Sequence, residues 1–142
     1  AGIGEPVFDK LDACLAKAVM SIGAVKGFEI GDGFAAARSR GSENNDAFYT
    51  DGDGTVKKRT NHAGGILGGI SDGSEIVLRA AFKPTPSIAR TQQTVNRNGE
   101  NVEIAIHGRH DPVVVPRAVV VVEAMTALTV LDLFLTAKNA RV

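Results

Sequence analysis

The spacing of apolar residues predicts a helix near each end of the chain. Between Pro6 and Ile22, apolar side chains recur every three or four residues and would share one face of a helix. Pro6 suits the first helical turn and Gly23 suits the stop. From Pro116 to about Lys138 the residues are apolar nearly all round a helix, so this second helix is expected in the interior.

Alternation and turn sequences predict short strands between the two helices. Val25 to Ile30 is expected to form one strand, and residues 75–82 alternate like a half-buried strand. The buried face of that strand would carry Ile76, Leu78, Ala80 and Phe82. Asp51–Gly54 and Asn98-Gly99 are typical hairpin turns. The strands expected around these turns are residues 47–50 with 55–60, and residues 94–97 with 101–106, the last with a buried face of Val102, Ile104 and Ile106.

Helices that flank a block of hairpins indicate an α+β fold, with antiparallel sheet packed against core helices. The chain fits a single domain over residues 1–142, and its 44% hydrophobic residues are typical of a globular protein. The longest apolar run, Ala118 to Leu131, is interrupted by Glu123 and is shorter than a membrane span. We expect Glu123 to hydrogen-bond either a backbone group or a partner subunit.

Charge and cysteine content narrow the classes of function. Sixteen basic residues balance sixteen acidic ones, so the net charge does not draw the chain to nucleic acid or to an anionic membrane. The single cysteine, Cys14, lies on the apolar helix face, where we expect a packed thiol. One cysteine cannot form an internal disulfide, which suits a reducing cytosol.

Three motifs are candidates for chemistry, each with a structural alternative. Residues 61–73 contain five glycines without the spacing of a dinucleotide fingerprint or a P-loop, and form either a packed turn or a place where a flat or phosphorylated ligand approaches the backbone. Lys83-Pro-Thr-Pro-Ser87 offers a cation and two hydroxyls that fit a phosphate, or simply ends an edge strand. Arg109-His-Asp111 offers a fork for an anion, while Asp111 could instead form a turn or help to cap the helix that follows.

Two other groups of charged residues are weaker candidates for a functional site. Asp51 and Asp53 do not match a calcium loop, because the Gly and the terminal Glu of an EF-hand are missing, and no metal site is expected. Lys57-Lys-Arg59 is a phosphate contact in one interpretation and a solvated hairpin face in the other, which we favour. This run supports an alternative function, a phosphate- or nucleic-acid-binding module without catalysis, against which the neutral charge and only seven aromatic residues argue.

Three blocks of the chain resemble chorismate synthase. They are SIGAVKGFEIGDGF at residues 21–34, NHAGGILGGISDG at residues 61–73 with KPTPS at 83–87, and GRHDP at residues 108–112 running to EAM at 123–125. Their order and spacing agree with the family, and the resemblance covers essentially the whole chain. It implies part of the family's β-α-β sandwich, and it extends only to the C-terminal part of family members, so we expect a C-terminal fragment. Gly23 departs from the family, which commonly has Asn there, as do Val113 and Val120, where Cys and Pro are frequent.

The resemblance also implies a function. Chorismate synthases are phosphate-lyases that convert 5-enolpyruvylshikimate 3-phosphate to chorismate by a 1,4-anti elimination, in the shikimate pathway of aromatic amino-acid biosynthesis. The reaction requires reduced FMN without net redox change, and the family is associated with NADP, although the source of the flavin's electrons stays open. The family implies a cytoplasmic homotetramer, and a fragment of it is expected to be inactive alone.

The family's pattern assigns site residues to this sequence. The residues that would border FMN are Gly23, Ala24, Gly68, Lys83, Pro84, Thr85, Pro86, Ser87 and Arg109. Asp111 matches an acidic residue placed near the flavin and implicated in proton relay. A carboxylate there can accept a proton if its pKa is tuned to the task.

Overall fold

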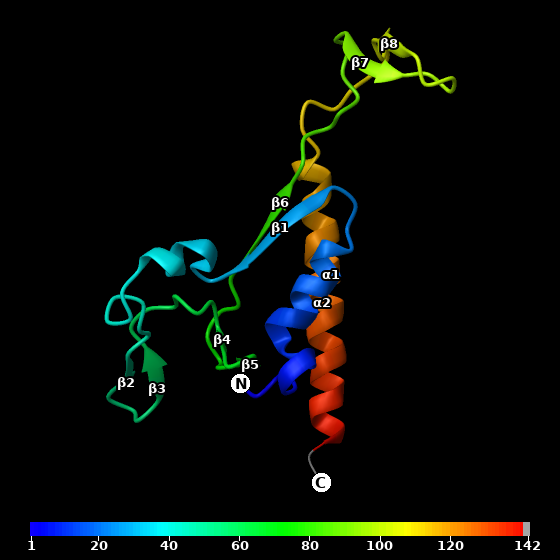
Figure 1. Cartoon of the computed structure of the whole chain (residues 1–142). Helices are drawn as coiled ribbons and strands as arrows, with labels where there is room; N and C mark the ends of the chain where they lie inside the picture. The colour runs from blue at the N-terminus through cyan, green and yellow to red at the C-terminus, as the bar shows by residue number, and fades with distance from the viewer. Residues whose placement is uncertain (141–142) are drawn as a thin grey trace.

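The computed structural model describes residues 1–140 and has an α+β fold, as predicted. Its strands pair into four antiparallel two-stranded sheets rather than one continuous sheet. The helices are η1 (Val7–Asp9), α1 (Leu11–Met20), η2 (Gly33–Arg38) and α2 (Val115–Asn139), of which η1 and η2 are 3-10 helices. The strands are β1 (Val25–Ile30), β2 (Phe48–Thr50), β3 (Val56–Lys58), β4 (Ile66–Leu67), β5 (Ile70–Ser71), β6 (Leu78–Phe82), β7 (Gln92–Val95) and β8 (Asn101–Ile104). Figure 1 shows α1 lying along α2, with the β1–β6 pair beside them.

Helix α1 is shorter at both ends than the predicted helix from Pro6 to Ile22. The residues after Pro6 form η1, and Lys10 then adopts an extended backbone with φ −55° and ψ 145°. Leu11 opens α1, and its N–H donates to the carbonyl of Gly69 at 2.8 Å. A contact with a distant turn therefore sets the start of the helix, and the periodicity of α1 alone does not contain that information.

The core joins α1, α2 and the glycine-rich segment. Leu11 and Leu15 lie one turn apart on α1 and are fully buried. They pack with Ile66 from β4 and Leu133 from α2 in one cluster. Cys14 packs beside this cluster, and burial raises the pKa of its thiol, which confirms the prediction of a packed cysteine.

Strands β1 and β6 form the ladder that lies nearest the helices. Their register runs from Val25 opposite Phe82 to Ile30 opposite Leu78, with an irregularity just after Val25. Exposure alternates along β6, as predicted. The strand begins at Leu78, however, and not at Glu75.

The residues just before β6 are bonded to glycine backbone instead. The Val77 N–H donates to the Gly64 carbonyl at 3.2 Å, and the Val77 carbonyl accepts the N–H of Gly31 at 2.9 Å. A Cβ on Gly64 would lie 2.4 Å from the Gly31 nitrogen, and both glycines have positive φ. Only glycine permits this close approach of two backbones, so the glycine-rich segment is used here for packing.

A buried cluster of charges fixes the β2–β3 hairpin to the glycine-rich segment. The Lys58 ammonium lies 2.7 Å from the Asp72 carboxylate and 3.6 Å from the Asp46 carboxylate. The exposed fractions of these side chains are 4%, 9% and 4%. Asp46 also accepts hydrogen bonds from the Thr60 hydroxyl and from two backbone N–H groups. The predicted solvated hairpin face is therefore wrong for Lys58, because its partners remove it from water.

The same contacts make the fold sensitive to acid. Burial raises the pKa of Asp46, but its hydrogen bonds and the charge of Lys58 outweigh burial and lower the pKa from 3.8 to about 2. Burial also raises the pKa of Asp72, but its hydrogen bonds from Lys58 and Ser74, together with the charge of Lys58, outweigh burial and lower the pKa. Because both pKa values are depressed in the folded state, these carboxylates stabilise the fold at neutral pH and lose that contribution as the pH falls from about 4 to about 2.

The β7–β8 hairpin projects away from the rest of the chain (Figure 1). Its register pairs Gln92 with Ile104 and Val95 with Asn101, around the predicted Asn98-Gly99 turn. Of the three residues predicted to be buried, Val102 is half-buried, Ile104 is 47% exposed and Ile106 is 38% exposed. The prediction that this face is buried is therefore wrong: within the described residues 1–140 nothing covers it, because the hairpin stands apart from the helices.

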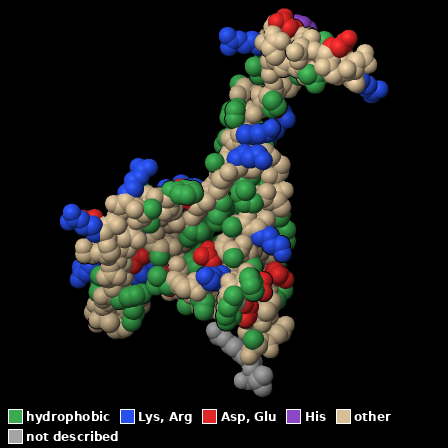
Figure 2. All heavy atoms as spheres, in the orientation of Figure 1, with side chains coloured by type: hydrophobic (Ala, Val, Ile, Leu, Met, Phe, Trp, Pro, Cys, Tyr) green, Lys and Arg blue, Asp and Glu red, His purple; other side chains and the backbone are tan. Residues whose placement is uncertain are grey.

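Helix α2 matches its predicted bounds within a residue at each end, but it is not interior. Its buried residues are Ala118 and Leu133 alone. Val120 and Leu128 are 63% and 61% exposed, because within residues 1–140 only part of the helix surface is covered. Figure 2 shows hydrophobic side chains at the surface along this side of the molecule.

Two further expectations about α2 need correction. By length and composition alone its 25 residues could cross a membrane, with a mean hydropathy of 2.1 in the most apolar window, so the prediction that no apolar segment is long enough was wrong. The core helix of a soluble protein passes the same test. Glu123 is exposed and forms no side-chain hydrogen bond within residues 1–140. Of the two partners expected for it, a backbone group within these residues is therefore ruled out.

We expect Lys58→Met to destabilise the protein by roughly 3–5 kcal/mol at pH 7, because two buried carboxylates lose their cation. Lys57→Met is the matched control, since its ion pair with Asp51 is 54% exposed on the lysine side and should contribute about 1 kcal/mol or less. Urea denaturation of both variants measures the difference. The deficit of Lys58→Met should shrink as the pH falls toward 2, and equal losses at the two lysines would contradict the buried cluster.

Candidate functional site

The ends of β1 and β6 bring two of the predicted site segments together. The Lys83 N–H donates to the carbonyl of Ala24 at 2.9 Å, just beyond the pairing of Val25 with Phe82. Ala24 has a φ of 71°, in the left-handed region that alanine rarely adopts. Gly23 is exposed, with open space where a Cβ would stand. The backbone therefore turns sharply beside the exposed Lys83 side chain.

The loop after β6 meets the segment that leads into α2. Ser87 Oγ lies 3.3 Å from Nδ1 of His110, although 23 positions separate the two residues. In the loop, Thr85 and Ser87 are half-buried, and Lys83, Pro84 and Pro86 are exposed. The Lys83–Ser87 loop and the Arg109–Asp111 segment, predicted as separate motifs, thus form one region. Figure 2 shows lysine and arginine side chains gathered on the neck between the helices and the outer hairpin.

Arg109 and Asp111 differ in their contacts. Arg109 is exposed and forms no ion pair or side-chain hydrogen bond within residues 1–140. The Asp111 carboxylate is paired with the Arg117 guanidinium, with nitrogen–oxygen distances of 2.9 and 3.4 Å. Asp111 does not cap α2, whose N-cap is Val114 without a side-chain bond. The capping interpretation of Asp111 is therefore wrong.

Sequence reasoning missed Arg117 and the link through His110. Arg117 lies in the first turn of α2, where the helix dipole disfavours a cation. A cation in that position signals a specific acidic partner, and here the partner is Asp111. For His110 no comparable signal exists, because its partner Ser87 lies on another loop.

Gly68 lies apart from the other predicted residues. It forms the turn between β4 and β5 with a φ of 60°, and a Cβ there would meet nothing within 4 Å. This turn packs near the start of α1, since Gly69 accepts the Leu11 N–H and a Cβ on Gly69 would lie 2.4 Å from Lys10. In Figure 1 the β4–β5 turn is at the opposite end of the β1–β6 pair from the Lys83 loop. Within one chain, Gly68 does not join the site.

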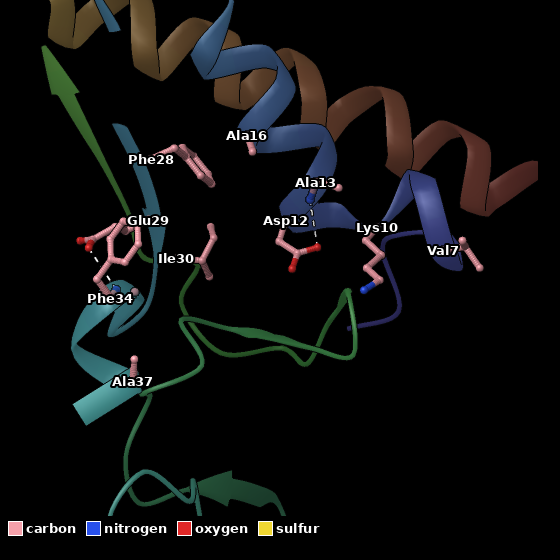
Figure 3. Close-up of a pocket in the computed structure, with 11 residues that line it drawn as sticks. Val7, Lys10, Asp12, Ala13, Ala16, Phe28, Glu29, Ile30, Phe34 and Ala37 are labelled. Atoms are coloured by element: carbon pink, nitrogen blue, oxygen red, sulfur yellow. Dashed lines mark hydrogen bonds between the residues drawn. The ribbon is translucent and has the colours of Figure 1, made fainter. Parts of the chain in front are cut away.

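A hollow between α1, β1 and η2 lies elsewhere (Figure 3). Phe28 and Ile30 of β1 and Phe34 of η2 face it on one side, and Asp12 and Lys10 at the start of α1 face it on the other. None of the predicted site residues lines it. A second, mostly apolar groove follows β6 and the first turns of α2, and ends next to the Lys83 loop. Its lining is Leu78, Ala80, Phe82, Val115, Ala118, Val119, Val122 and Glu123.

The residues around the Lys83 loop have the chemistry of a phosphate site. Lys83 and Arg109 are two exposed cations without acidic partners within residues 1–140. Thr85 and Ser87 add hydroxyl groups, and charge-assisted hydrogen bonds of this kind suit phosphate oxygens. The donor set therefore fits the phosphate of FMN or of a phosphorylated substrate.

The basic run of the β2–β3 hairpin does not form a comparable site. Lys57 is paired with Asp51 at 2.7 Å, and Lys58 is buried among carboxylates. The Arg59 guanidinium lies 5.1 Å from the ring centre of Tyr49. Each cation of the run already has a partner, which argues against the alternative of a nucleic-acid-binding module.

Comparison with known sequences places these features in one family. The family model described as chorismate synthase matches residues 1–135. A chorismate synthase of Lachnoclostridium phytofermentans is 69% identical over 141 residues, and one of Archaeoglobus fulgidus is 64% identical over 136 residues. These alignments cover 99% and 95% of this chain and 38% of each relative, so the chain spans well under half the length of the curated relatives it matches.

A solved structure agrees with the sequences. A structure titled "Crystal Structure of Chorismate Synthase" superposes with a TM-score of 0.74 at 35% sequence identity. The match covers 95% of this chain and 34% of that one. The family match and the fold both confirm the resemblance found in the sequence. The chain belongs to the chorismate synthase family.

Proposed function

We propose that this chain is the part of a chorismate synthase that carries the loop after β6 and the segment before α2, in a protein of the length of its relatives. The activity would be that of a phosphate-lyase, converting 5-enolpyruvylshikimate 3-phosphate to chorismate and phosphate by 1,4-anti elimination with reduced FMN. The observation that carries this proposal is the 69% identity with a chorismate synthase over 99% of the chain. The meeting of the Lys83–Ser87 loop with the Arg109–Asp111 segment supports it independently.

The roles of the residues follow from their chemistry. Lys83 and the Thr85 hydroxyl would hold a phosphate, and Ser87, whose hydroxyl lies against His110, would border it. The exposed fork of Arg109 would bind an anionic group of substrate or flavin. Gly23 and Ala24 would border the cofactor with backbone alone, since no side chain blocks Gly23. Asp111 would accept a proton through its carboxylate. Reduced flavin, when bound, supplies the electron-transfer chemistry that these side chains lack.

The assembly and location of the protein are part of the same proposal. The family resemblance favours a homotetramer in the cytoplasm, with NADP as a candidate link to the reduced flavin. The exposed apolar residues of α2 support an arrangement in which further protein covers this helix. Gly68, exposed and distant from the rest of the site, would face FMN only if such an arrangement brings it there.

The direct test is a chimera in which this chain replaces the matching segment of the Lachnoclostridium phytofermentans enzyme. We expect chorismate formation within about tenfold of the parent, assayed without oxygen with reduced FMN and 5-enolpyruvylshikimate 3-phosphate, a difference of about 1.4 kcal/mol in barrier. The isolated 142-residue chain should give none, because it spans 38% of that relative. A folded chimera without turnover would overturn the proposed function.

Lys83→Ala in the full-length enzyme should weaken FMN binding about tenfold or more, since a lost charge-assisted hydrogen bond costs roughly 1.5–3 kcal/mol. Lys57→Ala is the control, because its exposed pair with Asp51 lies on the β2–β3 hairpin and should matter little. Quenching of flavin fluorescence measures both affinities. Equal losses would mean that the proline-containing loop is only structural.

Asp111→Asn should lower turnover roughly 10²- to 10⁴-fold at saturating flavin, the usual effect of removing a positioned acid–base group. Arg117→Gln is the matched variant, because it breaks the same ion pair and keeps the carboxylate. If Asp111 only pairs with Arg117, the two variants should lose the same small amount, as exposed pairs do. Single-turnover chorismate formation, beside a thermal melt of each preparation, decides between these outcomes.

A further inference from the structure

His110 is held at both ring nitrogens. Its Nε2 lies 3.0 Å from the Ile106 carbonyl and its Nδ1 lies 3.3 Å from Ser87 Oγ. A carbonyl oxygen only accepts hydrogen bonds, so Nε2 carries a hydrogen and donates it. In the neutral ring Nδ1 then accepts the hydrogen of the Ser87 hydroxyl. Neither nitrogen is free to exchange a proton with a substrate while both contacts persist.

The contact with Ser87 joins the two segments that lead into and out of the β7–β8 hairpin. Between residues 83–91 and 105–114 it is the only hydrogen bond or ion pair within the described residues, apart from the β7–β8 ladder farther out. The chain between the two segments passes through the projecting β7–β8 hairpin (Figure 1), whose ladder holds them together only at their outer ends, where Gln92 pairs with Ile104. The His110 ring thus links residues 83–91 to residues 105–114 at the point where the chain leaves the helices for the β7–β8 hairpin.

The contact between Ser87 and His110 lies between two groups with different proposed roles, the phosphate-binding Lys83 and the proton-accepting Asp111. Ser87 ends the loop that begins with the Lys83 cation, and His110 stands between Arg109 and Asp111 in sequence. A shift of the loop relative to this segment would change the separation of the phosphate-binding cation from the carboxylate. Reactions between held groups lose large factors in rate when that separation is wrong by about 1 Å.

We infer that His110 is a positioning residue: its ring bridges Ser87 and Ile106 and thereby fixes the Lys83–Ser87 loop against the Arg109–Asp111 segment. This inference rests on the proposed function for the meaning of the two segments. His110 itself transfers no proton and acts through the geometry of its neighbours.

The test is a double-mutant cycle in the full-length enzyme, with His110→Ala, Ser87→Ala and the double variant. His107→Ala is the matched control, because His107 is an exposed histidine of the same segment without a side-chain hydrogen bond within residues 1–140. At saturating flavin and substrate, His110→Ala should lower kcat roughly 10- to 100-fold, and His107→Ala should leave it unchanged. The double variant should be no slower than the slower single variant, because both remove one link.

Two readouts separate positioning from catalysis and from folding. The pH profile of kcat should keep its shape in His110→Ala, since His110 moves no proton, and thermal melts should stay close to that of the unmodified enzyme. Nitrogen-15 NMR of the unmodified enzyme should show the Nε2–H tautomer of His110, and Ser87→Ala should change its Nδ1 shift without activity being measured at all. Ser87→Ala breaks the link from a loop residue, so it serves even if His110→Ala folds poorly.

The outcomes distinguish the two proposals. An unmodified enzyme that forms no chorismate overturns the proposed function, and the role of His110 falls with it. Normal activity of the unmodified enzyme with additive losses in the cycle overturns the role of His110 alone. Loss of one limb of the pH profile in His110→Ala, or a loss no larger than that of His107→Ala, has the same consequence.

Discussion

The backbone ladder between β1 and β6 sets both ends of the molecule. At one end it continues into the contact between Lys83 and Ala24, which brings the loop after β6 beside the turn at Gly23. At the other end it continues into the contact between Gly31 and Val77, which holds the glycine-rich segment. Because these contacts are made by the main chain, they depend on register, and at the Gly31 end they also depend on the absence of a side chain. The site and the core are therefore two ends of one structural unit.

The sequence predicts the elements of this fold better than their surroundings. Strand β1, the two hairpin turns and the bounds of α2 all follow from periodicity and turn chemistry, which are local properties. The start of α1 at Leu11 and the late start of β6 do not, because each is set by a backbone bond to a glycine in a distant part of the chain. Apolar residues all round α2 indicate burial, but they do not reveal which protein surface supplies it.

The surroundings of charged residues are equally hard to predict from the sequence. Lys57 and Lys58 are adjacent and equivalent in any pattern, yet one is solvated and the other buried, because Asp46 and Asp72 converge on only one of them. In the candidate site, the resemblance supplied the residue types of the Lys83 loop and of Arg109 to Asp111. That Ser87 meets His110, and that Asp111 meets Arg117, required coordinates. Whether Gly68 shares the site stays a prediction.

The composition of the core has a consequence for the order in which the molecule can fold. Leu11 and Leu15 are separated in sequence from Leu133, which completes their cluster, by nearly the whole length of the described chain. A ten-residue helix such as α1 is too short to be stable alone in water. Its apolar face must therefore wait for α2, and contacts between such distant residues form slowly. Until those contacts form, the apolar face of α1 stays in water, so the docking of α2 limits how soon this core can close.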